Sequence, residues 1–187
     1  AELIAEGGLL SVNGGVADVG TVRVRNGATL SFGSTFNTNI SEGGIVMEGG
    51  LLQGSTITTS STDAANRSLR GFGTVSNAVT NSGFVQAIGG TLQLTNTSSD
   101  WDGAGFGHLR ASGGGLLQLH GVGAFAFGGS VVAVEDSKVL TSGFVLNMGS
   151  ASSLQLTQGT YESGASIKVG GTVIVGAGAP STVKVAL

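Results

Sequence analysis

The residues best suited to chemistry lie close together in one short, glycine-rich segment. Residues 100–110 hold the only tryptophan of the chain, one of its two histidines and a pair of aspartates. An exposed tryptophan beside carboxylates suits a sugar ring, because the indole offers a flat apolar face and the carboxylates accept hydrogen bonds from hydroxyls. The sequence therefore predicts a protruding loop that contacts a ligand through Asp100, Trp101, Asp102, His108 and Arg110. The alternative is a plain surface turn with Trp101 tucked against the rest of the protein.

The same aspartates suggest two other kinds of chemistry. A pair of carboxylates can act as general acid and general base across a glycosidic bond. Asp100 and Asp102 are only two positions apart in one loop, however, and no second acidic cluster joins them. The pattern Asp-x-Asp-Gly also occurs in calcium loops, but the remaining ligands of that pattern are missing. We therefore predict no catalytic residue, no metal site and no cofactor.

The composition indicates a folded protein. The chain has 187 residues, of which 35 are glycine and one is proline, while 40% are hydrophobic and only 10% are charged. Disordered chains lack the apolar residues that offset the entropy of ordering, so this chain should fold. The length suits one domain, and we expect residues 1–187 to form a single domain that is a module of a longer chain or assembly.

Charge, cysteine content and hydropathy exclude several partners. A formal net charge of −3 does not supply the basic surface that binds nucleic acid. The absence of cysteine excludes a disulfide framework and a cysteine-ligated metal. No apolar run approaches the roughly 18 residues of a membrane-spanning helix. Residues 1–4 lack the basic start and apolar region of a signal peptide, and the missing initiator methionine suggests a processed or partial chain.

A repeat of about 20 residues organises the whole chain. A glycine-rich turn followed by an apolar-polar-apolar strand recurs, for example at residues 7–12, 27–32, 89–94 and 114–119. A second short strand often precedes each copy. Both strands alternate with period two, which puts one side inward and the other outward. The first inward apolar residue of each copy falls at positions 10, 30, 52, 75, 92, 117, 132, 154 and 173.

Equivalent positions carry equivalent residues, which favours a solenoid over a β-sandwich. Such positions line up only if successive coils stack in register and pair their backbone groups with the coils above and below. We expect an inner column of Leu10, Leu30, Leu52, Leu92, Leu117 and Leu154, and an outer polar ladder of Ser11, Ser31, Gln53, Gln93, Gln118 and Gln155. The sequence therefore predicts an all-β fold, a right-handed single-stranded parallel β-helix (a β-solenoid) of about nine coils.

Two segments resemble a known group of proteins. Residues 84–94 follow a pattern of Val or Phe-x-Val-x-x-Gly-Gly-Thr-Leu-x-Leu at every position except the third, where Gln86 replaces the valine, and residues 73–83 have a similar repeat character. Both segments resemble the passenger domains of bacterial autotransporters and haemagglutinin-like surface proteins, and trimeric phage tailspikes share the coil pattern. The resemblance implies a right-handed β-helix on a secreted or cell-surface protein, often an adhesin.

Three functions remain open at this point. The first is a non-catalytic structural or adhesive module that displays loops on a bacterial surface and binds a carbohydrate or host-surface ligand. The second is a phage or virion fibre component that recognises surface glycans and for which a trimer would be expected. The third is a polysaccharide-degrading enzyme that acts through Asp100, Asp102 and His108. Because uncapped coils expose unpaired strand edges, self-association or trimer formation through the coil ends is also expected.

The remaining charged residues are predicted to lie on the outside. Arg23, Arg110, Lys168 and Lys184 each stand between two apolar strand residues, so we expect them to point outward from comparable strands. Such charges keep a weakly charged solenoid soluble. Residues 135–138 are predicted to form a solvated turn with a local ion pair, and residues 60–71 a plain loop. The expected location is extracellular or at the cell surface, or else in a virion.

Overall fold

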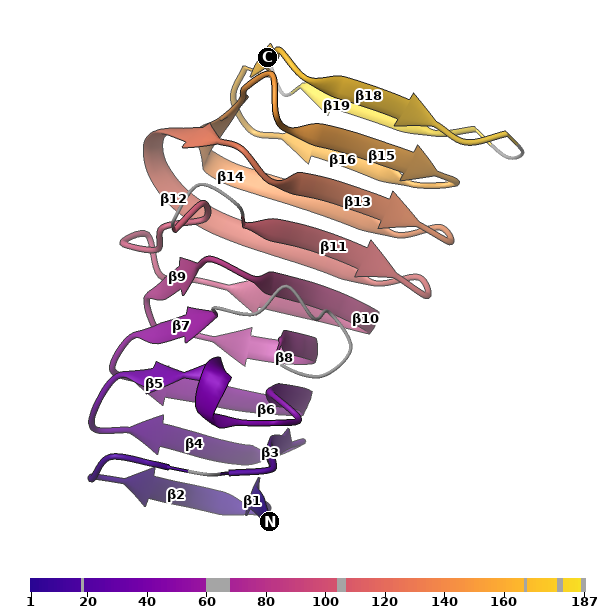
Figure 1. The fold of residues 1–187 in the computed structure, drawn as a ribbon. Coiled ribbons are helices and arrows are strands. Elements are labelled where there is room, and N and C mark those ends of the chain that lie inside the picture. Colours follow the sequence, from indigo (N-terminus) through magenta and orange to yellow (C-terminus); the bar gives the residue numbers. More distant parts are fainter. Residues whose placement is uncertain (18, 60–67, 104–106, 167, 178–179, 186–187) are drawn as a thin grey trace.

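Each turn of the chain adds one parallel strand next to the strand of the turn before it, so that the molecule is a stack of β-coils (Figure 1). The computed structural model describes residues 1–17, 19–59, 68–103, 107–166, 168–177 and 180–185. Strands make up 65% of the structure and helix 2%. Glycine and β-branched residues disfavour helix, which explains this balance.

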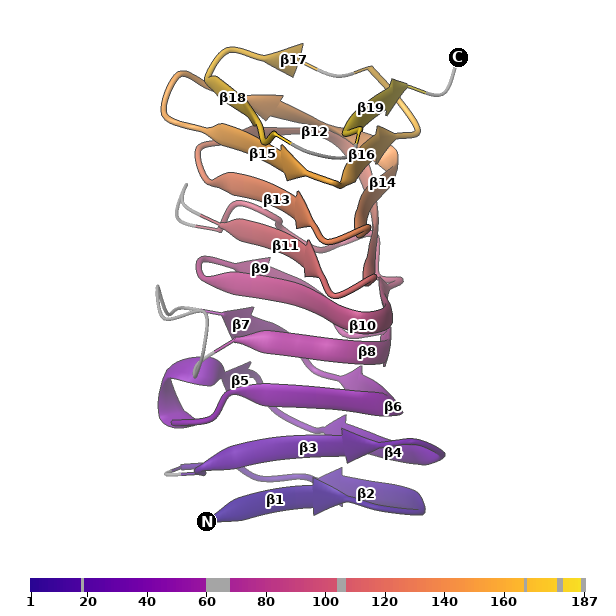
Figure 2. The same ribbon diagram turned by 90° about the vertical axis from the view of Figure 1, so that its right-hand side faces the viewer.

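One side of the solenoid, here named face A, is a parallel sheet built from one strand of every coil (Figure 2). In Figure 2 its strands all run from left to right across the stack while the chain rises from the N-terminus at the bottom to the C-terminus at the top, which makes the coil right-handed, as the sequence predicts. In order they are β1 (Glu2–Ala5), β3 (Thr21–Arg25), β6 (Ile45–Gly54), β8 (Leu69–Val75), β10 (Phe84–Leu94), β11 (His108–Ser112), β13 (Ser130–Val134), β15 (Ser153–Thr157) and β18 (Thr172–Val175).

The next side, face B, follows directly after a glycine-rich corner. The long strands β6, β8 and β10 bend round this corner, so their second halves belong to face B. The other strands of face B are β2 (Gly8–Val12), β4 (Ala28–Phe32), the first halves of β12 (Leu116–Phe127) and β14 (Lys138–Met148), β16 (Thr160–Ser163) and β19 (Thr182–Val185).

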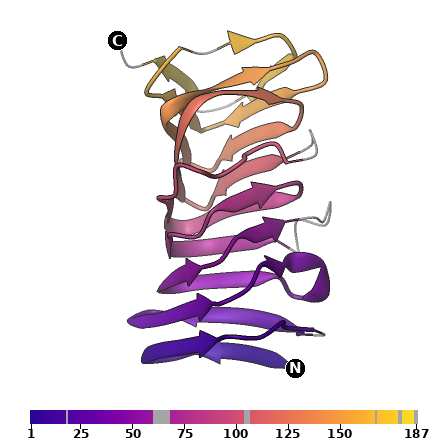
Figure 3. The same cartoon turned by 90° about the vertical axis from the view of Figure 1, so that its left-hand side faces the viewer.

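The third side, face C, is the least regular. Figure 3 shows the molecule with the left-hand side of Figure 1 toward the viewer. In the lower coils it consists of β5 (Phe36–Asn37), β7 (Ile57–Thr59) and β9 (Val79–Asn81), with the short 3-10 helix η1 (Thr38–Ile40) beside them. In the upper coils the second halves of β12 and β14 pair in parallel, and β17 (Lys168–Val169) follows β14.

The parallel β-solenoid is confirmed, with a small correction to the number of coils. The path through face A holds nine strands, which are separated by eight steps, and the solenoid makes about eight turns. The loop predicted for residues 60–71 ends before residue 71, because β8 already begins at Leu69. Residues 60–67 lie outside the described residues.

The predicted leucine column is correct only in parts. Leu10, Leu30 and Leu52 stack in register on face B, as predicted. Val75 follows Leu52, but its partner in the next coil is Leu94 rather than Leu92, because the register of β10 shifts between Ala87 and Leu92. Leu92 and Leu117 therefore stack in a neighbouring column of the same face.

Leu154 lies on face A, where it pairs with Val131. This also corrects the inward residue of that coil, because Val131 is buried while Val132 faces outward between Arg110 and Gln155. The outer polar ladder divides in the same way as the leucines: Ser11, Ser31 and Gln53 pair in one stack, Gln93 and Gln118 in another, and Gln155 lies on face A. The same turn-and-strand phrase opens strands of both faces, so spacing in the sequence does not identify the face.

The interior is filled by aliphatic and aromatic side chains together with a few polar ones. Phe32 and Phe36 stack at a centroid distance of 4.6 Å in the lower coils. In the middle coils Asn81 is fully buried; it accepts a hydrogen bond from the Thr59 hydroxyl at 2.6 Å and donates to the Trp101 carbonyl at 3.2 Å. Asn81 thus joins three successive coils, which satisfies its amide inside the core.

Candidate ligand-binding surface

Asp100 holds a tight turn. Its Oδ1 accepts hydrogen bonds from the backbone N–H groups of Asp102 and Gly103, each at 3.1 Å. Its own backbone N–H donates to the carbonyl of Val79 in β9 at 2.8 Å. An aspartate that bonds to the amides two and three positions ahead is a typical turn former. One oxygen of this carboxylate is therefore used by the chain itself.

Trp101 lies inside the solenoid. Its exposed fraction is 0%, and its ring stacks on Phe144 of β14 at a centroid distance of 6.1 Å. The expectation of an exposed indole is therefore wrong for this structure, and the alternative of a tucked tryptophan is correct. Burial of so large an apolar surface is favourable at about 25 cal/mol per Å². A ring without an exposed face offers no platform for a sugar.

Asp102 connects its turn to the coil above. Its side chain is only 8% exposed, and both carboxylate oxygens accept from the Gly128 N–H at 3.3 Å. Desolvation raises the pKa of Asp102, although hydrogen bonds from the Gly128 and Gly107 amides act in the opposite direction. The carboxylate is bound to the backbone just before β13. Residues 104–106 of the same segment lie outside the described residues.

The side chains of His108 and Arg110 differ from those of Asp100, Trp101 and Asp102, because both point outward from β11. Alternation along the strand puts Leu109 and Ala111 in the core and their neighbours outside. The His108 ring stacks on Phe84 of β10 at a centroid distance of 4.4 Å, and its Nδ1 lies 2.7 Å from the Ser130 hydroxyl of β13. Burial lowers the pKa of His108, so the ring favours the neutral form.

Arg110 lies on the outside of face A between Gln86 of β10 and Val132 of β13. Its Nε is buried and has no hydrogen-bond partner in the described part of the chain. Among those same residues Arg110 forms no ion pair with a carboxylate. The Gln86 amide, its nearest polar neighbour by register, donates to the Ser112 hydroxyl at 3.1 Å instead.

Arg110 belongs to a column of arginines that the sequence only partly indicates. The strand registers place Arg23, Arg70 and Arg110 at the same outward position of face A in alternate coils, and we call them the arginine column. Arg70 was not predicted, although its spacing from the other two corresponds to two repeats on either side. Lys168 and Lys184, which were expected on comparable strands, lie instead on face C and face B.

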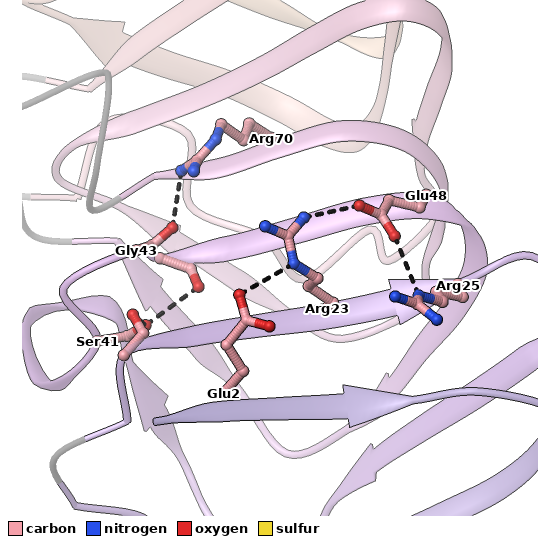
Figure 4. A network of polar contacts seen from close by, with 9 residues as sticks. Glu2, Arg23, Arg25, Ser41, Gly43, Glu48 and Arg70 are labelled. Carbon is pink, nitrogen blue, oxygen red and sulfur yellow. Dashed lines mark hydrogen bonds and ion pairs between the residues drawn. The ribbon is translucent and has the colours of Figure 1, made fainter.

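The three arginines differ in their partners (Figure 4). Arg23 forms ion pairs with Glu2 at 3.2 Å and with Glu48 at 2.7 Å. Arg70 donates to the carbonyl of Gly43 at 2.8 Å. The cations in the lower coils are therefore engaged by the protein, whereas Arg110 has no such partner among the described residues.

The predicted local ion pair at residues 135–138 is wrong. Lys138 pairs with Glu162 of the next coil at 2.5 Å, because both stand on the outer side of face B in adjacent strands. The Glu135 carboxylate accepts from the Gly113 N–H at 2.9 Å in the coil below. Both contacts run along the solenoid axis, between side chains and backbone groups of neighbouring coils rather than within the turn itself.

No group of three or more histidine, cysteine, aspartate or glutamate side chains suited to a metal ion occurs in the described part of the chain. Within the same residues, no helix is both long and apolar enough to cross a membrane.

Comparison of the sequence with protein-family models and with curated proteins finds no match, and comparison of the structure with solved structures finds none. The likeness to autotransporter passengers therefore has support at the level of the β-solenoid fold alone.

Proposed function

We propose that this chain is a non-catalytic extracellular module of a bacterial surface whose solenoid presents the outside of face A, around Arg110, to an acidic carbohydrate. The partners under this proposal are a carboxylate-bearing glycan and, at the coil ends, a second copy of the chain. The resemblance of the repeats to surface proteins supports the location, and the β-solenoid supports the role of a rigid display rod.

The observation that carries the proposal is the buried Nε of Arg110, a guanidinium donor without a hydrogen-bond partner among the described residues. A buried hydrogen-bond donor without a partner costs about 1–3 kcal/mol. A carboxylate matches the planar fork of a guanidinium with two parallel hydrogen bonds and supplies the missing acceptors. Uronic and sialic acids carry such a carboxylate on a sugar ring.

The surroundings of Arg110 also suit a saccharide. The stacked rings of Phe84 and His108 lie beside it on the same outer surface and offer a flat apolar contact. The site stands on three paired strands, β10, β11 and β13, rather than on a mobile loop. Binding groups on paired strands lose little freedom when a ligand binds, which favours affinity.

Titration of the isotope-labelled chain with oligogalacturonate, followed by NMR, tests the proposal. We expect shifts centred on β10, β11 and β13, and a loss of affinity of about tenfold or more in Arg110→Ala. Arg23→Ala is the matched control: it removes an arginine of the same column that already has carboxylate partners, and it should retain wild-type affinity.

A neutral maltohexaose serves as the control ligand, and it should bind much more weakly than the acidic probe. Binding that is equal for the two sugars, or equal in Arg110→Ala and wild type, would contradict the proposal. Absence of binding to oligogalacturonate and to a second acidic probe, sialyllactose, would also contradict it.

A further inference from the structure

The corner between face A and face B is hollowed in the lower coils. The hollow has a volume of about 490 Å³ and is lined by residues 26–29, residues 49–51 and Thr74, and we call it the corner hollow. Volumes of roughly 300–1,000 Å³ are typical of small-molecule sites. The lining comes from three successive coils, and a described coil lies both below and above these three. The hollow is therefore a feature of the side of the solenoid.

The floor of the corner hollow is apolar, and hydroxyl groups stand on either side of it. Leu51 lies on the outer side of face B, where the strand registers place Thr29 next to it in the coil below and Thr74 in the coil above. The two threonines are therefore about 10 Å apart, which is two coil spacings, with the leucine between them. A ligand that rests on Leu51 can bond to a hydroxyl on each side.

Phe72 stands at the edge of the corner hollow, and its ring is held in place. Its side chain is 42% exposed, although coils lie on both sides of it. A Cβ at Gly49, which lines the hollow, would lie 3.2 Å from Cε2 of the ring, and a Cβ at Gly90 in the coil above would lie 3.0 Å from the Phe72 Cβ. The ring is thus packed between two glycines while part of its surface stays open to solvent. An exposed, fixed aromatic ring is well suited to contact a ligand.

Asn26 supplies an amide at the opposite edge. A Cβ at Gly49 would also lie 3.2 Å from the Asn26 Cβ, so Gly49 separates this amide from the Phe72 ring. Among the residues that the structure describes, the side chains of Asn26, Thr29 and Thr74 form no hydrogen bond. Their donors and acceptors are therefore open to a ligand.

The charged residues beside the corner hollow are paired with one another (Figure 4). Arg25, which precedes Asn26, contacts Glu48, which precedes Gly49, at 3.6 Å. Arg25 also pairs with Glu6 at 2.7 Å. The described lining itself has no charged side chain. These features favour an uncharged ligand, because a charged one would find no complementary group there.

We propose that the corner hollow binds a neutral hexose of the glucose type, as one unit of an oligosaccharide. The ring hydroxyls of such a sugar are equatorial, so each face of the ring is a flat array of C–H groups. Phe72 and Leu51 offer the apolar contact for that face, while the amide and the two hydroxyls of the hollow bond to groups at the edge of the sugar. This proposal is independent of the acidic-carbohydrate site, because Arg110 lies on β11, two strands above β8.

Titration of the isotope-labelled chain with cellopentaose, a neutral oligomer of glucose, followed by NMR, tests the proposal. We expect shifts at residues 26–29, 49–51 and 72–74, and a Kd on the order of 1 mM. Phe72→Ala should weaken binding about tenfold or more, because the ring supplies most of the apolar contact. Asn26→Ala should weaken it about fivefold through the loss of one hydrogen bond.

Two further variants at position 72 separate an aromatic contact from a merely apolar one. Phe72→Tyr keeps the ring and should bind within about threefold of the wild type, whereas Phe72→Leu keeps an apolar side chain without the ring and should lose about tenfold in affinity. Val122→Ala is the matched control: it truncates an apolar side chain that is 66% exposed on β12, and it should bind like the wild type.

Circular dichroism of each variant confirms that it remains folded. Absence of shifts at the corner hollow with cellopentaose up to about 10 mM, or equal binding in Phe72→Ala and wild type, would overturn the proposal. Equal affinity of Phe72→Leu and wild type would assign the hollow to an apolar partner and overturn the sugar. Shifts confined to β10, β11 and β13 would overturn it as well, and would leave the acidic-carbohydrate site around Arg110 intact.

Discussion

At the scale of single residues, burial separates side chains that hold the fold from those that face a ligand. Trp101 looks most suited to chemistry in the sequence, yet it is wholly buried, and Asp102 bonds to the backbone of the next coil. Arg110 has fewer distinguishing features in the sequence, but it stands on the outer side of β11 and its Nε is a buried donor that lacks a partner among the described residues. Residue type indicated the region, whereas solvent exposure determined which residues remain available.

The raised pKa of Asp102 predicts a specific dependence of stability on pH. The folded carboxyl has a pKa above its ordinary value of 3.8, mainly through desolvation, so the folded state binds more protons than the unfolded state in the interval between the two values. The free energy of unfolding should therefore fall as the pH rises through that interval. Asp102→Asn should remove this fall, as measured by urea unfolding at a series of pH values.

Glu162 provides a control of opposite sign. Its hydrogen bond to Lys138 lowers its pKa from 4.5, so its contribution to stability is present above that value and is lost as the pH falls through the lower folded pKa. Glu162→Gln should remove this contribution to the free energy of unfolding above that pH. A pH profile of Asp102→Asn that is parallel to the wild-type profile would contradict the role assigned to burial.

At the scale of elements, the contacts between successive coils decide where a side chain lies. Gly71 shows this: it has a φ of +111°, and a Cβ there would clash with the carbonyl oxygen of Met47 in the coil below. The bulge in β10 between Ala87 and Leu92 shifts one column into another. Alternation within a strand was predictable from the sequence, but the bulge that changes the partner of Leu92 was not.

The buried amide of Asn81 should stabilise the contact between successive coils. It connects β9 to Thr59 of β7 and to the carbonyl of Trp101. Asn81→Ala leaves buried partners unsatisfied and should lower the free energy of unfolding by about 1–3 kcal/mol. Asn147→Ala, on the outer side of β14, is the control and should change it by less than about 0.5 kcal/mol. Equal effects of the two changes in urea unfolding would contradict the inter-coil role of Asn81.

At the scale of the whole molecule, each coil is stabilised by its two neighbours. The middle coils have a neighbour on both sides, while β1, β18 and β19 have one described neighbour each. In a stack whose stability is a sum of nearest-neighbour contacts, the ends open first. Amide hydrogen exchange at low protein concentration should therefore be slowest in β8, β10 and β12 and fastest in β18 and β19. Uniform protection along the chain would contradict this expectation.

The amino-acid sequence by itself determined that the chain is an all-β parallel solenoid, because period-two alternation and the glycine-rich turns are local features that repeat along it. It also determined that His108 and Arg110 point outward, since each flanks the inward Leu109 on one strand. Only the tertiary structure decided that Trp101 is buried, that Arg23, Arg70 and Arg110 share one column, and that Leu92 and Leu154 belong to different faces. Neighbours across coils depend on the lengths of the intervening turns and on bulges, which change the register without changing the repeated strand pattern.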